Sequence, residues 1–183
     1  MQPPWAISEA GEVVPVDPEV WLFEPGAWND VEATLGTPLP SDYKALIGDG
    51  LACVFDEELW IASPFDPNPS LNLLRELART SHTLAYLRHH DPAEFPDAPF
   101  PEPGGLLGWG GDGGGGIYAW DTSDPDPDRW RVAVTGRPVY DPSVQIQEHG
   151  LSGYLEGLAS GRIRAAALSG WPRPGASVER RKP

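Results

Sequence analysis

The residues best suited to chemistry in this 183-residue sequence are closely spaced aspartates, one cysteine and four histidines. The aspartates Asp121, Asp124, Asp126 and Asp128 offer carboxylates of the kind that calcium binds. An EF-hand loop needs glycine at its sixth position and glutamate at its twelfth, but counting from Asp121 places Asp126 and Val132 there. We therefore expect a solvated loop between strands, with cation binding or a partner contact as alternatives.

The histidines and the cysteine form no recognisable motif. His82 and His89 would share one helix face, but a third ligand and an HExxH sequence are missing, so surface histidines are expected. Cys53 lies between Ala52 and Val54, which predicts a small buried side chain, with a reactive thiol as the alternative. A GxSxG elbow is also absent, so a Ser–His–Asp site would have to arise from folding alone.

A run of glycines between Gly108 and Gly116 is interrupted only by Trp109 and Asp112. A phosphate-binding loop would continue with lysine, then serine or threonine, and then a helix. Here the apolar run Ile117–Trp120 follows and predicts a strand. We expect a turn or bulge that uses positive φ angles, with a partner contact at the loop tip as the alternative.

The charge is distributed unevenly. The formal net charge is −14, but residues 1–161 hold 26 acids and 7 bases, whereas residues 162–183 hold six bases and one acid. A body with this excess of acids repels phosphate backbones, which argues against direct nucleic-acid binding. It attracts basic proteins and speeds their encounter, although the acids could also serve only solubility.

Neither a signal peptide nor a membrane span is recognisable in the sequence. A single cysteine cannot form an internal disulfide, so an oxidising compartment is not required. We expect a cytoplasmic protein without cofactor or bound metal.

The hydrophobic pattern predicts helices, then antiparallel strands, then a helix, which is an α+β order. Asn68 should cap the longest helix, which ends near His90, and Ser152 should cap the last one, which stops at Gly161. The expected helices are 27–35, 40–47, 68–90 and 152–161; the expected strands are 12–16, 51–55, 59–62, 106–109, 116–121, 129–135 and 139–140.

We divide the chain into three parts: an arm over residues 1–26 that packs on the body, a body over 27–161, and a basic Arg/Pro-rich tail over 162–183. The tail should be mobile from about Ser169 onward. Within the body, residues 91–105 carry five prolines and should form an irregular connection.

Three segments, taken in order, resemble the SUKH superfamily of cell-wall assembly regulators and bacterial immunity proteins. The first holds Trp28, Val31-Glu32, Leu35-Gly36-Thr37-Pro38-Leu39-Pro40-Ser41-Asp42-Tyr43 and Leu59 to Pro64; the second holds Leu107-Gly108-Trp109-Gly110, Gly116-Ile117-Tyr118-Ala119-Trp120-Asp121 and Asp128-Arg129-Trp130-Arg131-Val132; the third holds Gly150-Leu151-Ser152-Gly153-Tyr154-Leu155 and Leu158-Ala159-Ser160-Gly161. The arm, the proline-rich connection and the basic tail are not part of this pattern.

The resemblance implies a curved, mostly antiparallel sheet packed against helices. It also implies protein binding without catalysis, typically an immunity protein that neutralises a polymorphic toxin of nuclease or deaminase type. The alternatives are a regulatory domain without a toxin partner and a metal-dependent hydrolase that uses the acids of residues 112–128. The expected partner contacts are Asp56, Glu57, Glu58, Asp112, Asp121 and Asp124, with Trp109 or Trp120 as an anchor. Most of the tryptophans in or beside strand candidates, Trp60, Trp109, Trp120 and Trp130, are expected in the core, and one or two at strand ends are the candidates for such an anchor.

Overall fold

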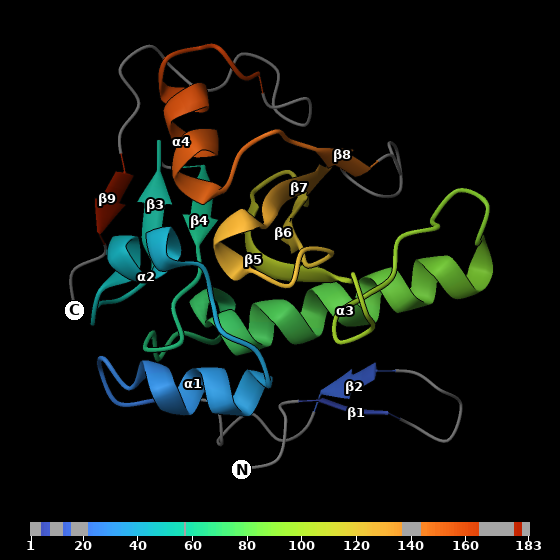
Figure 1. The fold of residues 1–183 in the computed structure, drawn as a ribbon, viewed down its shortest axis with the longest axis horizontal. Helices are drawn as coiled ribbons and strands as arrows, with labels where there is room; N and C mark the ends of the chain where they lie inside the picture. The colour runs from blue at the N-terminus through green and yellow to red at the C-terminus, as the bar shows by residue number, and fades with distance from the viewer. Residues whose placement is uncertain are drawn as a thin grey trace.

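The computed structural model describes residues 5–7, 13–15, 22–56, 58–136, 144–164 and 178–180, and every structural statement below concerns these residues. For 5–7 and 13–15 it describes the backbone. Figure 1 shows the long helix α3 (Leu73–His90) lying across the middle of the molecule, with α4 (Leu151–Ala159) at the top and α1 (Trp28–Leu35) below α3.

Within the described residues, seven strands form one open antiparallel sheet in the order β8-β7-β6-β5-β4-β3-β9. The register shifts between Gly108 and Gly110, which is a β-bulge that bends the sheet. The α+β fold with a curved antiparallel sheet is therefore confirmed. The strands are β3 (Cys53–Phe55), β4 (Leu59–Ile61), β5 (Leu106–Asp112), β6 (Ile117–Asp121), β7 (Arg131–Thr135), β8 (Val144–Ile146) and β9 (Val178–Arg180).

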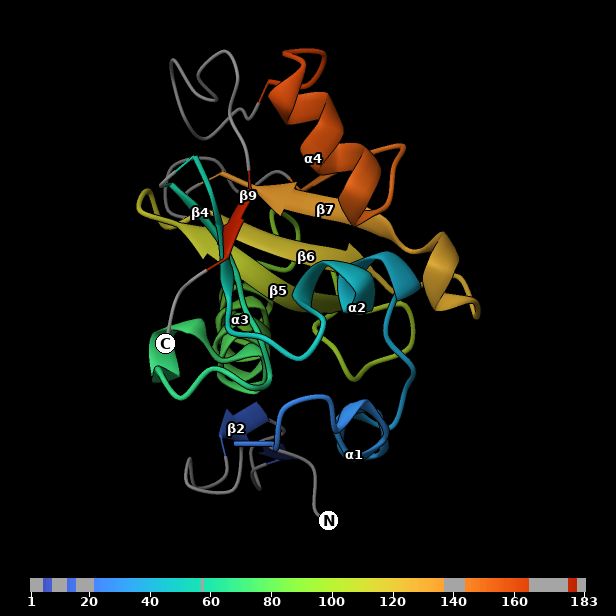
Figure 2. The same ribbon diagram turned by 90° about the vertical axis from the view of Figure 1, so that its left-hand side faces the viewer.

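Helices cover both faces of the sheet (Figure 2). The α-helices of the described residues are α1 (Trp28–Leu35), α2 (Ser41–Ile47), α3 (Leu73–His90) and α4 (Leu151–Ala159). Alternate side chains of β6 point to opposite faces. Trp120 packs edge-on against Tyr43 of α2, with ring centroids 5.0 Å apart, whereas Ala119 belongs to a smaller cluster with Leu84 of α3.

The bulge region of β5 lies against α3 so closely that only glycine fits. A Cβ added at Gly108 would lie 2.3 Å from the Thr80 hydroxyl oxygen, and Thr80 is fully buried on α3. Glycine at this position therefore sets how close the helix and the sheet come.

The helix caps differ from the sequence prediction. Asn68 caps the short 3₁₀ turn η2 (Pro69–Leu71), and α3 begins afterwards, where the Asn72 side chain accepts the N–H groups of Leu74 and Arg75. Each of the two segments has its own asparagine cap because the chain turns between the 3₁₀ segment and the helix.

Ser152 does not cap α4, so this prediction is wrong. Helix α4 begins after Gly150, and the backbone N–H of Ser152 donates to the Asp42 carboxylate at 2.9 Å. A side chain of α2 therefore supplies the acceptor for α4.

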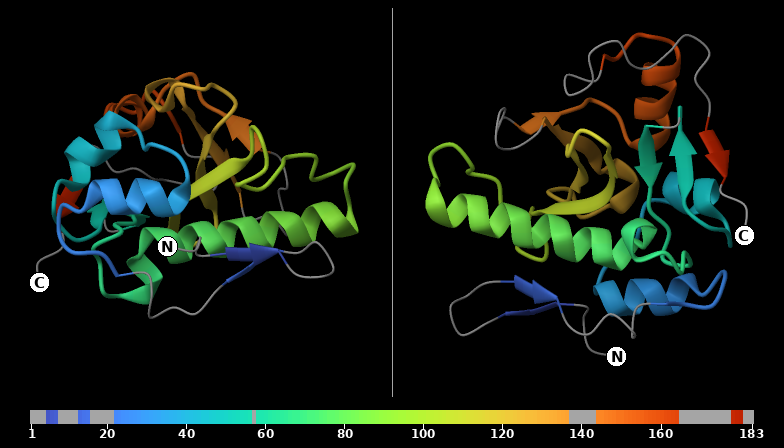
Figure 3. Two further views of the ribbon diagram at one scale, coloured as in Figure 1. Left: turned by 60° about the horizontal axis from the view of Figure 1, so that its bottom comes forward. Right: turned by 180° about the vertical axis from the view of Figure 1, so that it is seen from behind.

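The chain ends contribute strands. The strand expected at 12–16 is confirmed as β2 (Val13–Pro15), which pairs with β1 (Trp5–Ile7) and lies along α3 in both views of Figure 3. In the tail, Val178–Arg180 form β9 and pair with β3, so the expectation of a mobile tail is wrong for these three residues. The strand expected at 139–140 lies outside the described residues.

Candidate partner-binding surface

Strand register separates the predicted contact residues into two groups. Leu59 at the start of β4 pairs with Asp112 at the end of β5, whereas Leu106 at the start of β5 pairs with Asp121. The seven residues of β5 span roughly 20 Å at 3.3 Å per residue. The turns that hold Asp56 and Asp112 therefore lie at one end of the sheet, and the loop that begins at Asp121 lies at the other.

This separation bears on the hydrolase alternative. Asp112 and Asp121 are at opposite ends of the β5–β6 hairpin, so Asp112 cannot share a metal ion with the aspartates of residues 121–128. Among the described residues, no cluster of three or more His, Cys, Asp or Glu is arranged to bind a metal ion.

Trp109 and Trp120 are not available to a partner. Both side chains are fully buried and belong to the main core, where their ring centroids lie 6.0 Å apart. They point toward the sheet face that α2 and α4 cover. The expectation that either tryptophan anchors a partner is wrong, because sequence position beside a strand does not tell which face the side chain occupies.

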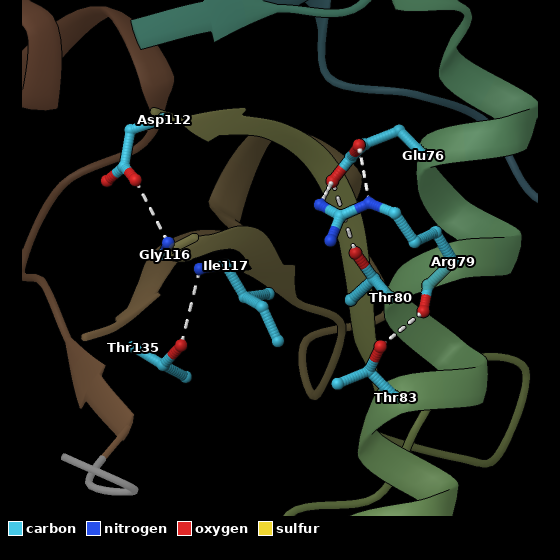
Figure 4. A network of polar contacts seen from close by, with 8 residues as sticks. All are labelled: Glu76, Arg79, Thr80, Thr83, Asp112, Gly116, Ile117 and Thr135. Atoms are coloured by element: carbon cyan, nitrogen blue, oxygen red, sulfur yellow. Dashed lines mark hydrogen bonds and ion pairs between the residues drawn. The ribbon is translucent and has the colours of Figure 1, made fainter. Parts of the chain in front are cut away.

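Asp112 is also buried, so its predicted role as a surface contact is wrong. Its carboxylate accepts the Gly116 N–H at 3.0 Å (Figure 4). It also accepts the Tyr118 hydroxyl at 2.8 Å. A Cβ at Gly116 would lie 2.7 Å from this carboxylate, which explains the glycine there. Burial, helped by Tyr154 and then Asp112, raises the pKa of Tyr118, which keeps it a hydrogen-bond donor. Asp112 therefore holds the 112–116 turn closed.

The acids of the β3–β4 turn remain at the surface. Asp56 and Glu58 are half-buried, and Asp56 has a positive φ of 50°, unusual for a residue other than glycine. Glu57 lies outside the described residues.

At the opposite end, the β6–β7 loop is ordered by its own aspartates. Each carboxylate accepts a backbone N–H two residues ahead: Asp121 from Ser123, Asp124 from Asp126, and Asp126 from Asp128, at 2.9 to 3.1 Å. These consecutive Asx turns hold the backbone of the loop. We call the surface formed by Asp121, Asp124, Asp126 and Asp128 the aspartate loop.

The aspartate loop is also fastened to the core. The buried Trp130 indole donates to the Asp124 backbone oxygen at 2.7 Å, and the Thr122 hydroxyl donates to the Gly105 carbonyl at 2.8 Å. Arg131 pairs with Asp121 at 3.0 Å, whereas Arg129 stands 3.8 Å from Asp124 and is largely exposed. The loop therefore presents its remaining carboxylate oxygens from a fixed backbone.

The start of α2 contacts this loop, and α2 in turn contacts the start of α4. The Ser41 N–H at the start of α2 donates to Asp128 at 2.6 Å, and this bond lowers the pKa of Asp128. Asp42 of α2 then accepts the N–H of Ser152 from α4. Sequence reasoning places Asp126 and Asp128 in one loop with Asp121 and Asp124, but it does not find Asp42 beside that loop. The Asp126-Pro127 pair signals a turn, but nothing in the sequence indicates which helices lie beside it.

A second polar cluster lies on α3 and is structural. Arg79 binds the buried Glu76 carboxylate through two nitrogens, and the Thr80 hydroxyl lies 3.4 Å from the same group (Figure 4). Burial raises the pKa of Glu76, and Arg79 partly offsets this. The cluster faces β5 at the close approach of Thr80 and Gly108.

The remaining chemical candidates lie apart from one another. His82 and His89 are exposed on α3, as expected for surface histidines. Cys53 is buried, and burial raises the pKa of its thiol, which confirms the expected buried side chain.

Comparisons with known proteins give no match among family models, curated proteins or solved structures. In the described part of the chain, the helices are too short or too polar to cross a membrane.

Proposed function

We propose that this chain is a protein-binding domain without catalytic activity whose partner is a basic protein. The observation that supports it best is the aspartate loop, where each of the four carboxylates accepts a backbone N–H group, in addition to the ion pairs that Arg131 and Arg129 make with Asp121 and Asp124. An acidic surface that is ordered before binding loses less conformational entropy when a cationic partner docks. It also raises the association rate with such a partner.

Within this class, we propose an immunity protein that neutralises a polymorphic toxin of nuclease or deaminase type in the cytoplasm. Two observations support it: the resemblance to the SUKH superfamily in three ordered segments, and the excess of 19 acids over bases in residues 1–161. Nucleases are basic where they hold phosphate, so an acidic surface competes with the substrate for the same groups. The protein acts without cofactor, nucleic acid or membrane.

The experiment is protection of cells. The chain is co-expressed with the product of a toxin gene that neighbours its own gene, and survival is compared with an empty vector. Survival restored by at least tenfold supports the proposal. A toxin that still kills, although the chain is expressed and folded, overturns the immunity role. A stable endogenous complex that contains no toxin would favour a regulatory domain instead.

A charge variant then tests the surface. The triple variant D124N, D126N, D128N removes three charges, but each asparagine oxygen still accepts the backbone N–H that holds the loop. The matched control D30N, D91N, E94Q removes three charges from exposed positions elsewhere. We expect the association rate with the toxin to fall at least tenfold for the triple variant and less than threefold for the control. Equal losses would show that only net charge matters.

A further inference from the structure

The outer edge of the sheet at β3 is covered by a three-residue segment of the chain's own tail. In β9, Val178 pairs with Phe55, Glu179 with Val54 and Arg180 with Cys53. Without β9, strand β3 would present a row of unpaired N–H and C=O groups, which is a template for another strand. The structure therefore shows an edge that accepts an added antiparallel strand.

Side chains select what lies on this edge. Val178 packs against the main core, and Arg180 donates to the Leu46 carbonyl oxygen at 2.9 Å. Leu46 lies in the last turn of α2, where the helix dipole favours a cation. The exposed Glu179 lies between these two contacts, and alternate residues of a strand point to opposite faces. The edge therefore recognises an extended segment that has an apolar residue and, two positions later, an arginine.

Arg180 lies beside the glycine that ends α2. Gly48 follows α2 with a positive φ of 64°, and a Cβ there would lie 3.8 Å from the Arg180 guanidinium. The guanidinium therefore lies at the end of α2, next to the Leu46 carbonyl oxygen to which it donates.

The charge of the surroundings fits the same ligand. Asp49 and Asp56 flank β3 in the chain, and Arg181 and Lys182 follow β9 in the sequence. The tail is thus a basic segment on an acidic body, and it has the charge that we propose for the partner.

We propose that the β3 edge is a docking site for an extended basic segment of a partner protein, with the pattern apolar-x-Arg, and that Val178–Arg180 occupy it until the partner displaces them. Recognition of this kind takes affinity from main-chain hydrogen bonds and specificity from alternate side chains. The claim that a partner protein docks there rests on the proposed protein-binding function. Whether the β3 edge binds an added strand can be tested without any toxin.

The probe is a fluorescent peptide of residues 174–183, added to the full-length chain and followed by anisotropy. In the wild type the resident strand competes at an effective concentration of the order of millimolar. In R180E a carboxylate faces the Leu46 carbonyl, so the resident strand is weakened and the peptide should bind at least tenfold more tightly than to the wild type. E179A is the matched control and should bind like the wild type within threefold.

Two further measurements separate docking from general attraction of charges. A peptide with Arg180→Ala and a scrambled peptide of unchanged charge should each bind R180E at least tenfold more weakly than the native peptide. Amide hydrogen exchange at Cys53–Phe55 should be faster in R180E and slow again when the native peptide is added. If R180E does not fold, R180Q replaces it.

Equal binding of native and scrambled peptides would overturn the proposal, as would a folded R180E that binds no better than the wild type. Neither result would affect the toxin-protection experiment. Conversely, failure of protection leaves the peptide result standing, so the two proposals fail separately.

Discussion

The Asp42 carboxylate on α2 accepts the backbone N–H of Ser152 on α4 at 2.9 Å, across 110 residues of sequence. The same helix receives help at its own start, because Ser41 donates to Asp128 of the aspartate loop. Two carboxylates therefore link the aspartate loop to α2 and α2 to α4. Each carboxylate accepts a backbone N–H at the start of a helix to which it does not itself belong. This arrangement couples the proposed binding surface to the stability of the fold.

Replacing Asp42 tests that coupling. D42A should lower the free energy of unfolding by about 1 kcal/mol, the usual cost of losing a side-chain acceptor at a helix start. D42N keeps an acceptor oxygen and should cost less than half as much. Urea denaturation measures both. If the two variants were equally destabilised, charge and not the hydrogen bond would be what holds α4.

Gly108 sets the approach of β5 to α3. G108A places a methyl group 2.3 Å from the Thr80 hydroxyl oxygen position, so helix or strand must shift, at a cost of about 1–3 kcal/mol. Gly113 of the same hairpin is exposed, and its Cβ position is 3.9 Å from the nearest atom, Glu58 Oε2. G113A should therefore stay within about 0.5 kcal/mol of the wild type in thermal or urea unfolding. Similar losses for both alanines would contradict the close packing.

Tyr118 and Tyr154 form a matched pair in the core. Tyr118 donates to the buried Asp112 carboxylate, so Y118F should cost about 1.5–3 kcal/mol, the range for a hydrogen bond to a charged group. The buried Tyr154 hydroxyl has no hydrogen-bond partner within the described residues, so Y154F should be neutral or stabilising. Urea unfolding measures the stability of both variants. If Y154F lowered the free energy of unfolding as much as Y118F, this hydrogen-bond assignment would be contradicted.

Glu76 should make stability depend on pH. Burial raises the pKa of Glu76 in the folded state above the ordinary 4.5. At pH values between 4.5 and the pKa of the folded state, the folded chain therefore binds more protons than the unfolded chain. The free energy of unfolding therefore falls as pH rises through this interval. E76Q removes this titration. Its free energy of unfolding should therefore rise relative to that of the wild type as pH rises through the interval, and this gain should be absent below pH 4.5.

The measurement is urea unfolding of wild type and E76Q between about pH 4 and about pH 8. Glu94→Gln, at an exposed position, is the control for loss of one acid. An advantage of E76Q that is the same at every pH would show that burial of the charge is not the cause.

Local elements of the fold follow from the sequence. Helices α1 and α2, the β3–β4 hairpin and strands β5 to β7 appear where apolar spacing and glycine or proline punctuation predict them. Gly36 and Gly161 both have positive φ at the ends of helices, as expected of stop signals. The burial of Cys53 also follows from its apolar neighbours.

The candidate site was predictable only in part. The sequence indicates that Asp121 and Asp124 belong to a loop between strands. It leaves Trp109 and Trp120 open between the core and a partner contact, and it offers Asp112 as a contact, although all three are buried. A strand pattern repeats every two residues, so a side chain is placed inside or outside only when the pairing register and the covering helices are known.

The sequence by itself therefore determined the class of elements, their order and the acidic charge of the body, because propensity, periodicity and charge are properties of neighbouring residues. Only the tertiary structure decided that Asp112 and Asp121 lie at opposite ends of a hairpin and that Asp42 completes α4. It also decided that Val178–Arg180 cover the β3 edge. The last two contacts join residues far apart in the chain, and they form because backbone groups at a helix start and at a sheet edge take hydrogen-bond partners wherever packing brings them.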